Sequence, residues 1–391
     1  MRRRGWFHEI PPNGRVTRPV LAPTNDHRAG IYAEEIDPSI ETTPEHRNLA
    51  AGDPTCAGWE RRRDDPNVLA LREQLREHNG IPELETCDPH EVERATEIFH
   101  RDGFVVVRDA LTGERFDALR EATERVIDEI LDVDPLGEAG GGAGGLPHRY
   151  SFGATSASRH RLHEPAWANV IDLPTTTPIL TEIFGSDTYV CGGGGGDLAL
   201  PGAIECQGLH SDNLWAEPHD PVGGLTMRQL PASVVTINFA MVDLTWENGP
   251  IRQIPGSQRW MDPIPNVVDE PQWMKWSTVC PAPAGSAIIR DNRAWHSGTP
   301  NLSDHVRALP NIEYYAPWFR SESIHRCLPY DVWTTLSDHA KRCCRYVVAN
   351  PGETVLGAGF THPRQSERDA FLARQAAEVG EQAASEWWLR R

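Results

Sequence analysis

Lysine is almost absent from this sequence, although the chain carries many charged residues. Only Lys275 and Lys341 occur among 391 residues, and the formal net charge is −18. This acidic balance argues against nucleic acid as a partner, because nucleic-acid binding depends on cationic side chains that neutralise phosphates. An acidic surface mainly keeps a protein soluble and implies no particular partner.

Long apolar runs and paired cysteines are lacking as well. No stretch approaches the roughly 20 apolar residues of a membrane helix, and no apolar segment follows the basic start of the chain. We therefore expect no secretory signal, no membrane partner and a cytoplasmic location. The eight cysteines form no C-x-x-C pair, so we interpret them as reduced thiols, mostly in the core, and not as a zinc or disulfide framework.

With 39% hydrophobic residues, the chain is long enough to bury a sizeable core. We expect three parts: a partly irregular N-terminal extension (1–87), a main domain (88–345) and a helical tail (346–391). The extension is rich in Pro, Arg, Asp and Glu, with one helical pattern over 67–75. Beyond Gln365 the tail is rich in Ala, Glu and Arg, which again favours a helix.

Helical and strand-like patterns alternate at the start of the main domain. A helical pattern over 89–104 leads into the strand-like run 104–108, and a second amphipathic helix follows Gly113. From about 188 to 317 short strands with turn signals between them predominate, notably 233–242, 287–289 and 306–316. The order predicts a mainly β protein with flanking helices, built as a double-sheet barrel or jelly roll.

Two glycine-rich runs interrupt this order, at 140–145 and 192–196. The first matches G-x-G-x-x-G by its letters, but it follows a helical pattern instead of joining a strand to a helix. We therefore reject a dinucleotide-binding site there. We expect both runs to form loops, in which glycine also permits close approach of a ligand to the backbone.

The strongest chemical signal is His210-Ser-Asp212 together with a later histidine, His296. On a strand, residues two apart point to the same face, so His210 and Asp212 would converge on one side. His296 follows the predicted strand 287–289 and supplies a third ligand. Two imidazoles and one carboxylate form the facial ligand set of non-haem iron(II) oxygenases, which leaves three positions open for co-substrate and O₂. An H-x-D pair alone is common by chance.

Arg307 stands eleven residues beyond His296, after a turn-rich segment over 298–304. A hairpin there would place His296 at the end of one strand beside Arg307 at the start of the next. A buried guanidinium at that point would bind a carboxylate through two parallel hydrogen bonds, as the far end of 2-oxoglutarate requires. Taken alone, Arg307 is better explained by a surface ion pair.

Taken in order, these motifs resemble the phytanoyl-CoA dioxygenase family of iron(II)- and 2-oxoglutarate-dependent oxygenases. The resemblance runs from about 90 to 317 and rests on four segments of the chain. They are the start of the domain, the first ligand motif, a turn with its strand, and the final motif: 101–111, 210–212, 247–257 and 296–309. Four motifs in the same order are far more specific than any one of them.

The resemblance implies a cupin-like double-stranded β-helix in which His210, Asp212 and His296 bind iron(II). It also implies that Arg307 binds the C5 carboxylate of 2-oxoglutarate, with Asn238 as a further co-substrate contact and Gln207 as a less specific one. The expected reaction consumes O₂ and 2-oxoglutarate, releases succinate and CO₂, and most simply hydroxylates a small organic molecule. Asp212 argues against halogenation, because halogenating relatives have a small residue there. Desaturation, cyclisation and epimerisation stay open.

Two segments depart from the family pattern. Gln258 follows Ile-Pro-Gly-Ser where the family often has His, but the turn is structural, so the departure costs little. The segment 213–232 is longer than usual, and we expect it to cover the substrate as a lid, with a solvated loop as the plainer alternative.

Other functions remain to be weighed against an oxygenase. A cupin-like metalloenzyme that does not use 2-oxoglutarate would have no need of Arg307 and Asn238. A binding or structural protein on the same scaffold would have no need of an intact ligand triad. With so few lysines, a secondary metabolite or amino-acid derivative is a more attractive substrate than a coenzyme A thioester, although arginines could bind its phosphates.

Overall fold

The computed structural model describes residues 63–133, 148–153, 161–204, 206–212, 222–223, 225–265, 270–275, 278–319 and 326–353. Its α-helices are α4 (Pro66–Glu77), α5 (Val92–Asp102), α6 (Gly113–Val133), α7 (Pro165–Ala168), α8 (Thr177–Phe184), α9 (Gln272–Lys275), α10 (Tyr330–Thr334) and α11 (Asp338–Cys343). Its strands are β1 (Thr86–Cys87), β2 (Phe104–Val107), β3 (Arg149–Phe152), β4 (Val190–Ala199), β5 (Val234–Phe239), β6 (Ile251–Gln253), β7 (Ala287–Asp291), β8 (His296–Gly298) and β9 (Arg307–Tyr315).

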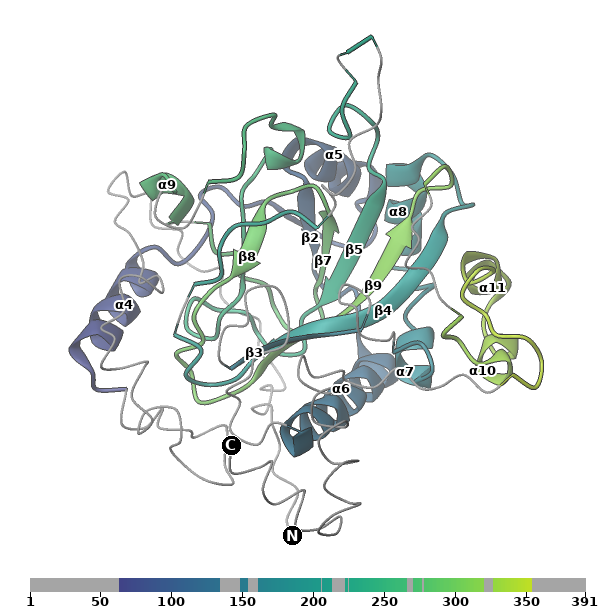
Figure 1. Ribbon diagram of the computed structural model, residues 1–391, viewed down its shortest axis with the longest axis horizontal. Helices are drawn as coiled ribbons and strands as arrows, with labels where there is room; N and C mark the ends of the chain where they lie inside the picture. The colour runs from purple at the N-terminus through teal and green to yellow at the C-terminus, as the bar shows by residue number, and fades with distance from the viewer. Residues whose placement is uncertain are drawn as a thin grey trace, which may run out of the picture.

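Seven strands form one large sheet, which we call the major sheet. Its order is β1-β2-β7-β5-β9-β4-β3, and every pair is antiparallel except β1 with β2. Figure 1 shows these strands side by side at the centre of the molecule. Strands far apart in the sequence are therefore neighbours, as in a jelly roll.

A minor sheet lies against one face of the major sheet. Its strands β6 and β8 are antiparallel, and bridges add His210 beside His296 and Val279 beside Arg252. Side chains from the major sheet reach this layer: Arg290 contacts His296, and Arg307 donates to the carbonyl oxygen of Gly249. We call the face that carries these arginines the inner face. The two layers form the predicted double-stranded β-helix, with helices around it.

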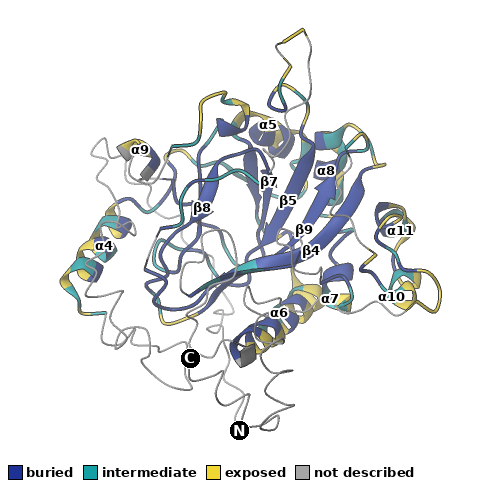
Figure 2. Ribbon diagram, in the orientation of Figure 1, coloured by how far each residue is buried: buried dark blue, intermediate teal, exposed yellow. Residues whose placement is uncertain are grey.

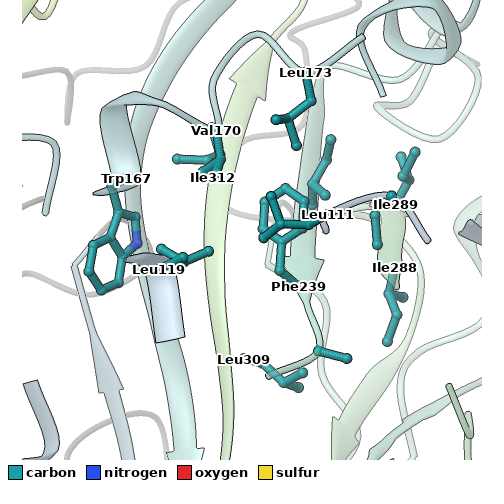
Figure 3. Close-up of a cluster of buried hydrophobic side chains, with 14 of the residues drawn as sticks. Leu111, Leu119, Trp167, Val170, Leu173, Phe239, Ile288, Ile289, Leu309 and Ile312 are labelled. Atoms are coloured by element: carbon teal, nitrogen blue, oxygen red, sulfur yellow. The ribbon is translucent and has the colours of Figure 1, made fainter. Parts of the chain in front are cut away.

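Apolar side chains fill the space between the opposite, outer face of the major sheet and the helices. Ile312 of β9 and Phe239 of β5 lie in this cluster with Trp167, Val170 and other residues of the helical layer (Figure 3). The strands are buried along their length, while α4 and α6 expose one side to solvent (Figure 2). Full burial of such side chains contributes about 1.5–3 kcal/mol each, so this layer fixes the sheet on which the inner-face residues stand.

The glycine run 192–196 is part of β4, so our prediction of a loop was wrong. A Cβ atom on Gly194 would lie 2.9 Å from side-chain atoms of both Ile312 and Trp167. The Trp167 indole also donates to the carbonyl oxygen of Gly195 at 2.8 Å. Glycine is required here because a large aromatic ring packs directly on the strand, a contact made by a residue distant in sequence.

The hairpin expected between His296 and Arg307 is not formed. His296 begins β8 in the minor sheet, whereas Arg307 begins β9 in the major sheet. The turn-rich segment therefore crosses from one layer to the other. A turn signal alone cannot distinguish these outcomes, because both place polar and small residues between two strands.

The predicted helices are found where the structure describes them. Helix α4 begins at Pro66 and is capped by the Asp65 side chain, which accepts a hydrogen bond from the Asn67 amide. Helix α5 ends at Gly103, whose φ of 82° is the left-handed conformation that favours glycine. The run 140–145 and the tail beyond 365 lie outside the described residues.

Two expectations about the whole chain can also be compared with the structure. The seven described cysteines are buried, as predicted for most of the cysteines. Within the described ranges, no helix is both long and apolar enough to cross a bilayer.

Candidate metal centre and co-substrate site

Three side chains from distant parts of the sequence meet between the two sheets. One ligand atom from each of His210, Asp212 and His296 lies within 4.8 Å of the others. His210 and His296 come together because their backbones form a bridge, with the His210 amide donating to the His296 carbonyl and the reverse. The backbone ladder thus positions two of the three groups.

The free nitrogens of both imidazoles point toward the cluster. Nε2 of His210 is 3.7 Å from Oδ1 of Asp212, and Nε2 of His296 is 3.3 Å from Oδ2. Nδ1 of each ring lies near a carbonyl oxygen, that of Gly208 at 3.1 Å and that of Ala294 at 3.0 Å. A carbonyl only accepts, so a proton on Nδ1 of His210 makes this bond and leaves its Nε2 lone pair for a metal. Nδ1 of His296 also lies 2.9 Å from Nη1 of Arg290, which only donates, so the Ala294 carbonyl alone does not set the tautomer of His296.

Arg290 of β7 controls the charge of this cluster. Its Nη1 lies 2.9 Å from Oδ2 of Asp212 and 2.9 Å from Nδ1 of His296. Burial alone would raise the pKa of Asp212, but His296 and Arg290 outweigh it and hold that pKa well below its usual range. Burial, helped by Arg290, lowers the pKa of His296 to about 4. The cluster therefore pairs a carboxylate with a neutral imidazole, which are the states that bind metals.

Asn292 connects the ligand segment to the major sheet. Its carbonyl oxygen accepts from the Asp212 amide at 2.9 Å and from the Ser211 hydroxyl at 3.0 Å. Its side chain accepts from the Thr236 hydroxyl at 2.7 Å and donates to Glu313 at 3.2 Å. One asparagine thus fixes the backbone that carries Asp212 relative to β5 and β9.

Arg307 lies buried on the inner face near a second arginine. Its Nε donates to the Gly249 carbonyl at 2.6 Å. Burial, together with the charge of Arg149 on β3, lowers the pKa of Arg307 to about 9. Arg149 donates to the Thr299 carbonyl at 2.5 Å, and its guanidinium also lies against Gly298. A buried arginine beside a half-buried one suits a bound carboxylate, because an anion offsets their mutual repulsion.

The two amides expected near the co-substrate have different surroundings. Oε1 of Gln207 accepts from the Gly298 amide at 3.0 Å and sits close to Arg149. Asn238 lies on the inner face directly across from Asn311 in the β5–β9 register. Both asparagines are about 1% exposed, and neither Oδ1 atom has a hydrogen-bond partner among the described residues. Such atoms are costly to bury without a partner, so a contact of Asn238 with a ligand stays a prediction.

Four further residues of this site escaped the sequence analysis: Arg149, Arg290, Asn292 and Glu313. These four residues belong to no recognisable sequence motif, and only the pairing of strands brings them close to the metal-ligand candidates. Alternation along β7 and β9 would have placed Arg290 and Glu313 on the inner face had the strand register been known. Half of the segment expected to form a lid (213–232) lies outside the described residues, namely 213–221 and residue 224.

The donor set fits iron(II). Two imidazole nitrogens with free lone pairs and one ionised carboxylate are the protein ligands of mononuclear non-haem iron sites. Hydrogen bonds to both Nδ1 atoms and to Asp212 supply the outer support that such ligands require. The side chains of His210 and Asp212 retain 30% and 21% exposure, so one side of the cluster stays open to small molecules.

Comparison with known families gives one match. The profile of the family described as phytanoyl-CoA dioxygenase (PhyH) matches residues 99–309, more than half of the chain. This range begins within α5 and ends within β9, so it contains all the ligand candidates.

Curated relatives and solved structures are more distant. Dioxygenase aneA of Aspergillus aculeatus is 22% identical over 72% of this chain and 87% of that protein. Dioxygenase af480 of Aspergillus fumigatus is 27% identical over 45% of this chain, and the match spans only 53% of that protein. Among solved structures, the non-haem α-ketoglutarate-dependent epimerase SnoN from nogalamycin biosynthesis is 17% identical, covers 58% of this chain and 83% of its own, and has a TM-score of 0.40.

Proposed function

Because this chain belongs to the phytanoyl-CoA dioxygenase family of iron(II)- and 2-oxoglutarate-dependent oxygenases, we propose that it hydroxylates a small organic molecule at a metal bound by His210, Asp212 and His296. The observation that carries this proposal is the convergence of the three ligand atoms within 4.8 Å. Succinate and CO₂ are the expected co-products.

When bound, iron(II) with 2-oxoglutarate activates O₂ for oxidation of the substrate. The chain's own part is to hold the ligands in the correct protonation state. The Gly208 carbonyl keeps the proton of the His210 imidazole on Nδ1, and Arg290 keeps Asp212 ionised. A carboxylate at position 212 would fill the coordination site that a halide would need, so halogenation is not the proposed outcome.

In the same proposal, Arg307 binds the C5 carboxylate of 2-oxoglutarate. Its fork-shaped guanidinium matches the geometry of the C5 carboxylate. Arg149 contributes a second positive charge nearby, and buried Asn238 carries an amide Nδ2 group of the kind that donates to a carboxylate oxygen. Gln207 supports this end indirectly, because its side chain accepts from the Gly298 amide beside Arg149.

The first test measures succinate formed from 2-oxoglutarate in the presence of iron(II), ascorbate and O₂, with a metabolite mixture as substrate source. We expect formation by the wild type and a loss of at least about 100-fold in His210→Ala, because removal of one ligand impairs metal binding. His90→Ala is the matched control, since His90 is exposed. Equal rates in wild type and His210→Ala would refute the metal assignment.

Hydroxylation is tested once the metabolite screen yields a substrate. With heavy-isotope O₂, one labelled oxygen atom is expected in the product and one in succinate. A product that has lost hydrogen, closed a ring or inverted a stereocentre without gaining oxygen would show that the reaction is desaturation, cyclisation or epimerisation instead of hydroxylation. The assignment to the oxygenase class would stand.

A further inference from the structure

The inner face of β9 carries a carboxyl group that the proposed chemistry does not use. Glu313 pairs with Thr236 of β5, and Thr236 in turn pairs with Arg290 of β7. Paired residues lie on the same face of a sheet about 5 Å apart. Since Arg290 touches both Asp212 and His296, Glu313 stands in the row of side chains that borders the metal ligands.

Glu313 and Arg307 lie at opposite ends of this region. They are six residues apart on one strand, which corresponds to about 20 Å between their Cα atoms. A molecule of 2-oxoglutarate bound to Arg307 at one end and to the metal at the other would span the distance between these two points and reach no further. Glu313 therefore lies beyond the co-substrate, on the side where the substrate has to meet the metal.

Two neutral donors hold the Glu313 carboxyl group in a fixed position. The Tyr315 hydroxyl donates to one oxygen at 2.9 Å, and the Asn292 side chain donates to the other at 3.2 Å. Each carboxylate oxygen accepts more than one hydrogen bond, so both retain acceptor capacity. The arrangement orients the group without neutralising it, as a site for a further donor requires.

The neighbours of Tyr315 are apolar. Val190, Val234 and Tyr315 form a buried cluster against which Phe319 packs. The Tyr315 ring lies over Gly192, where a Cβ atom would come within 2.6 Å of it. Glu313 is thus a single strong acceptor next to an apolar wall, which suits a ligand that is mostly apolar and has one polar group.

The charges on the inner face favour an uncharged ligand. Asp197 of β4 lies across from Leu309 of β9 and interacts with Arg307. With it, the region holds three arginines and three carboxyl groups: Arg149, Arg290, Arg307, Asp197, Asp212 and Glu313. Iron(II) and the dianion of 2-oxoglutarate add equal and opposite charge. Burial, with a smaller contribution from Asp212, raises the pKa of Glu313 to about 7, so the balance of three positive and three negative side chains holds above that pH, where this carboxyl group is ionised. A charged substrate would leave a buried charge without compensation.

We propose that Glu313 is a substrate-binding residue that accepts a hydrogen bond from the hydroxyl or N–H group of an uncharged, largely apolar substrate. This contact orients the substrate's C–H bond toward the metal. The inference rests on the proposed function, since it takes the metal and Arg307 as the two fixed points of the site.

The test uses four probes of similar size: cyclohexanol, methylcyclohexane, cyclohexanecarboxylate and cyclohexylammonium. Their binding to the anaerobic protein with iron(II) and 2-oxoglutarate is followed by the change in the visible charge-transfer absorption. In the wild type, cyclohexanol is expected to bind at least about tenfold more tightly than the other three, because only it donates to Glu313 without bringing a charge.

Two substitutions separate a binding role from a structural one. In Glu313→Leu the preference for cyclohexanol over methylcyclohexane should fall about tenfold. In Glu313→Gln the new amide donor should shift the preference from cyclohexanol toward cyclohexanecarboxylate, an effect that loss of packing does not produce. Glu121→Leu, at an exposed position of α6, is the control and should retain the wild-type order.

Several outcomes would overturn the proposal: failure of the wild type to prefer cyclohexanol, tighter binding of cyclohexylammonium, or unchanged preferences in Glu313→Gln. These are distinct from failure of the proposed function. If the wild type forms no succinate in the activity test, the function is wrong. If it forms succinate but the probes show no dependence on residue 313, only the present inference fails.

Discussion

At the scale of single residues, the metal cluster depends on side chains that bind no metal in the proposed function. Asp212 is ionised because Arg290 and His296 outweigh the effect of burial on its pKa. Its backbone amide is held by the Asn292 carbonyl. These contacts fix both the charge and the direction of one ligand. At the other end of the site, the Gly249 carbonyl orients the guanidinium of Arg307 in a similar way.

Replacement of Arg307 by Lys tests whether this residue binds the C5 carboxylate of 2-oxoglutarate. Lysine keeps the charge but loses the planar fork, and we expect the KM for 2-oxoglutarate to rise about 10- to 100-fold. The value is measured from initial rates of succinate formation at varied 2-oxoglutarate. Arg326→Lys is the control, because Arg326 is about half exposed. A KM within twofold of the wild type would show that the carboxylate binds elsewhere.

The sequence predicted residues with a motif and missed those without one. His210, Asp212 and His296 were found because ligand chemistry restricts both residue type and spacing. Arg290 and Glu313 were missed, since an arginine or a glutamate in a β-rich segment has many ordinary explanations. Only the register of β7, β5 and β9 brings these two residues to the metal cluster.

At the scale of elements, β4 shows how packing overrides local propensity. Glycines 192–196 favour a loop by composition, yet they form the middle of a strand. The strand gains its stability from β9, with which it pairs over most of its length, and from Trp167 packed across it. Neither partner is near in sequence, so local reasoning predicted the helices and the apolar strands but not this one.

Gly194→Ala tests this account. The added methyl group would lie 2.9 Å from atoms of Trp167 and Ile312, and we expect the free energy of unfolding to fall by about 1–3 kcal/mol. In a Trp167→Leu background the same change should cost less, because the obstructing ring is gone. Urea denaturation of the four proteins gives the coupling energy, expected to exceed about 0.5 kcal/mol. Additive effects would mean that another contact excludes the side chain.

At the scale of the whole molecule, helix α4 packs against segments of the main domain that connect its strands and does not stand apart. Val68, Leu71 and Leu75 are buried in a cluster with Ile204 and Leu302. Arg72 donates to the Leu302 carbonyl at 2.6 Å and pairs with Glu247. Glu247 lies two residues before Gly249, whose carbonyl accepts from Arg307. The helix thus supports the turn that holds the co-substrate end, across the domain boundary predicted at residue 87.

Leu71→Ala tests whether this contact belongs to the stability of the main domain. Leu71 is fully buried, whereas Leu69 on the same helix is 48% exposed. We expect Leu71→Ala to lower the free energy of unfolding by about 2–5 kcal/mol and Leu69→Ala to change it by less than about 0.5 kcal/mol. Urea denaturation followed by tryptophan fluorescence measures both. A loosened helix should also weaken the support of Gly249, so the KM for 2-oxoglutarate should rise in Leu71→Ala alone. If instead the main transition and that KM stay unchanged, residues up to 87 form an independent extension, as the boundary predicted from the sequence implies.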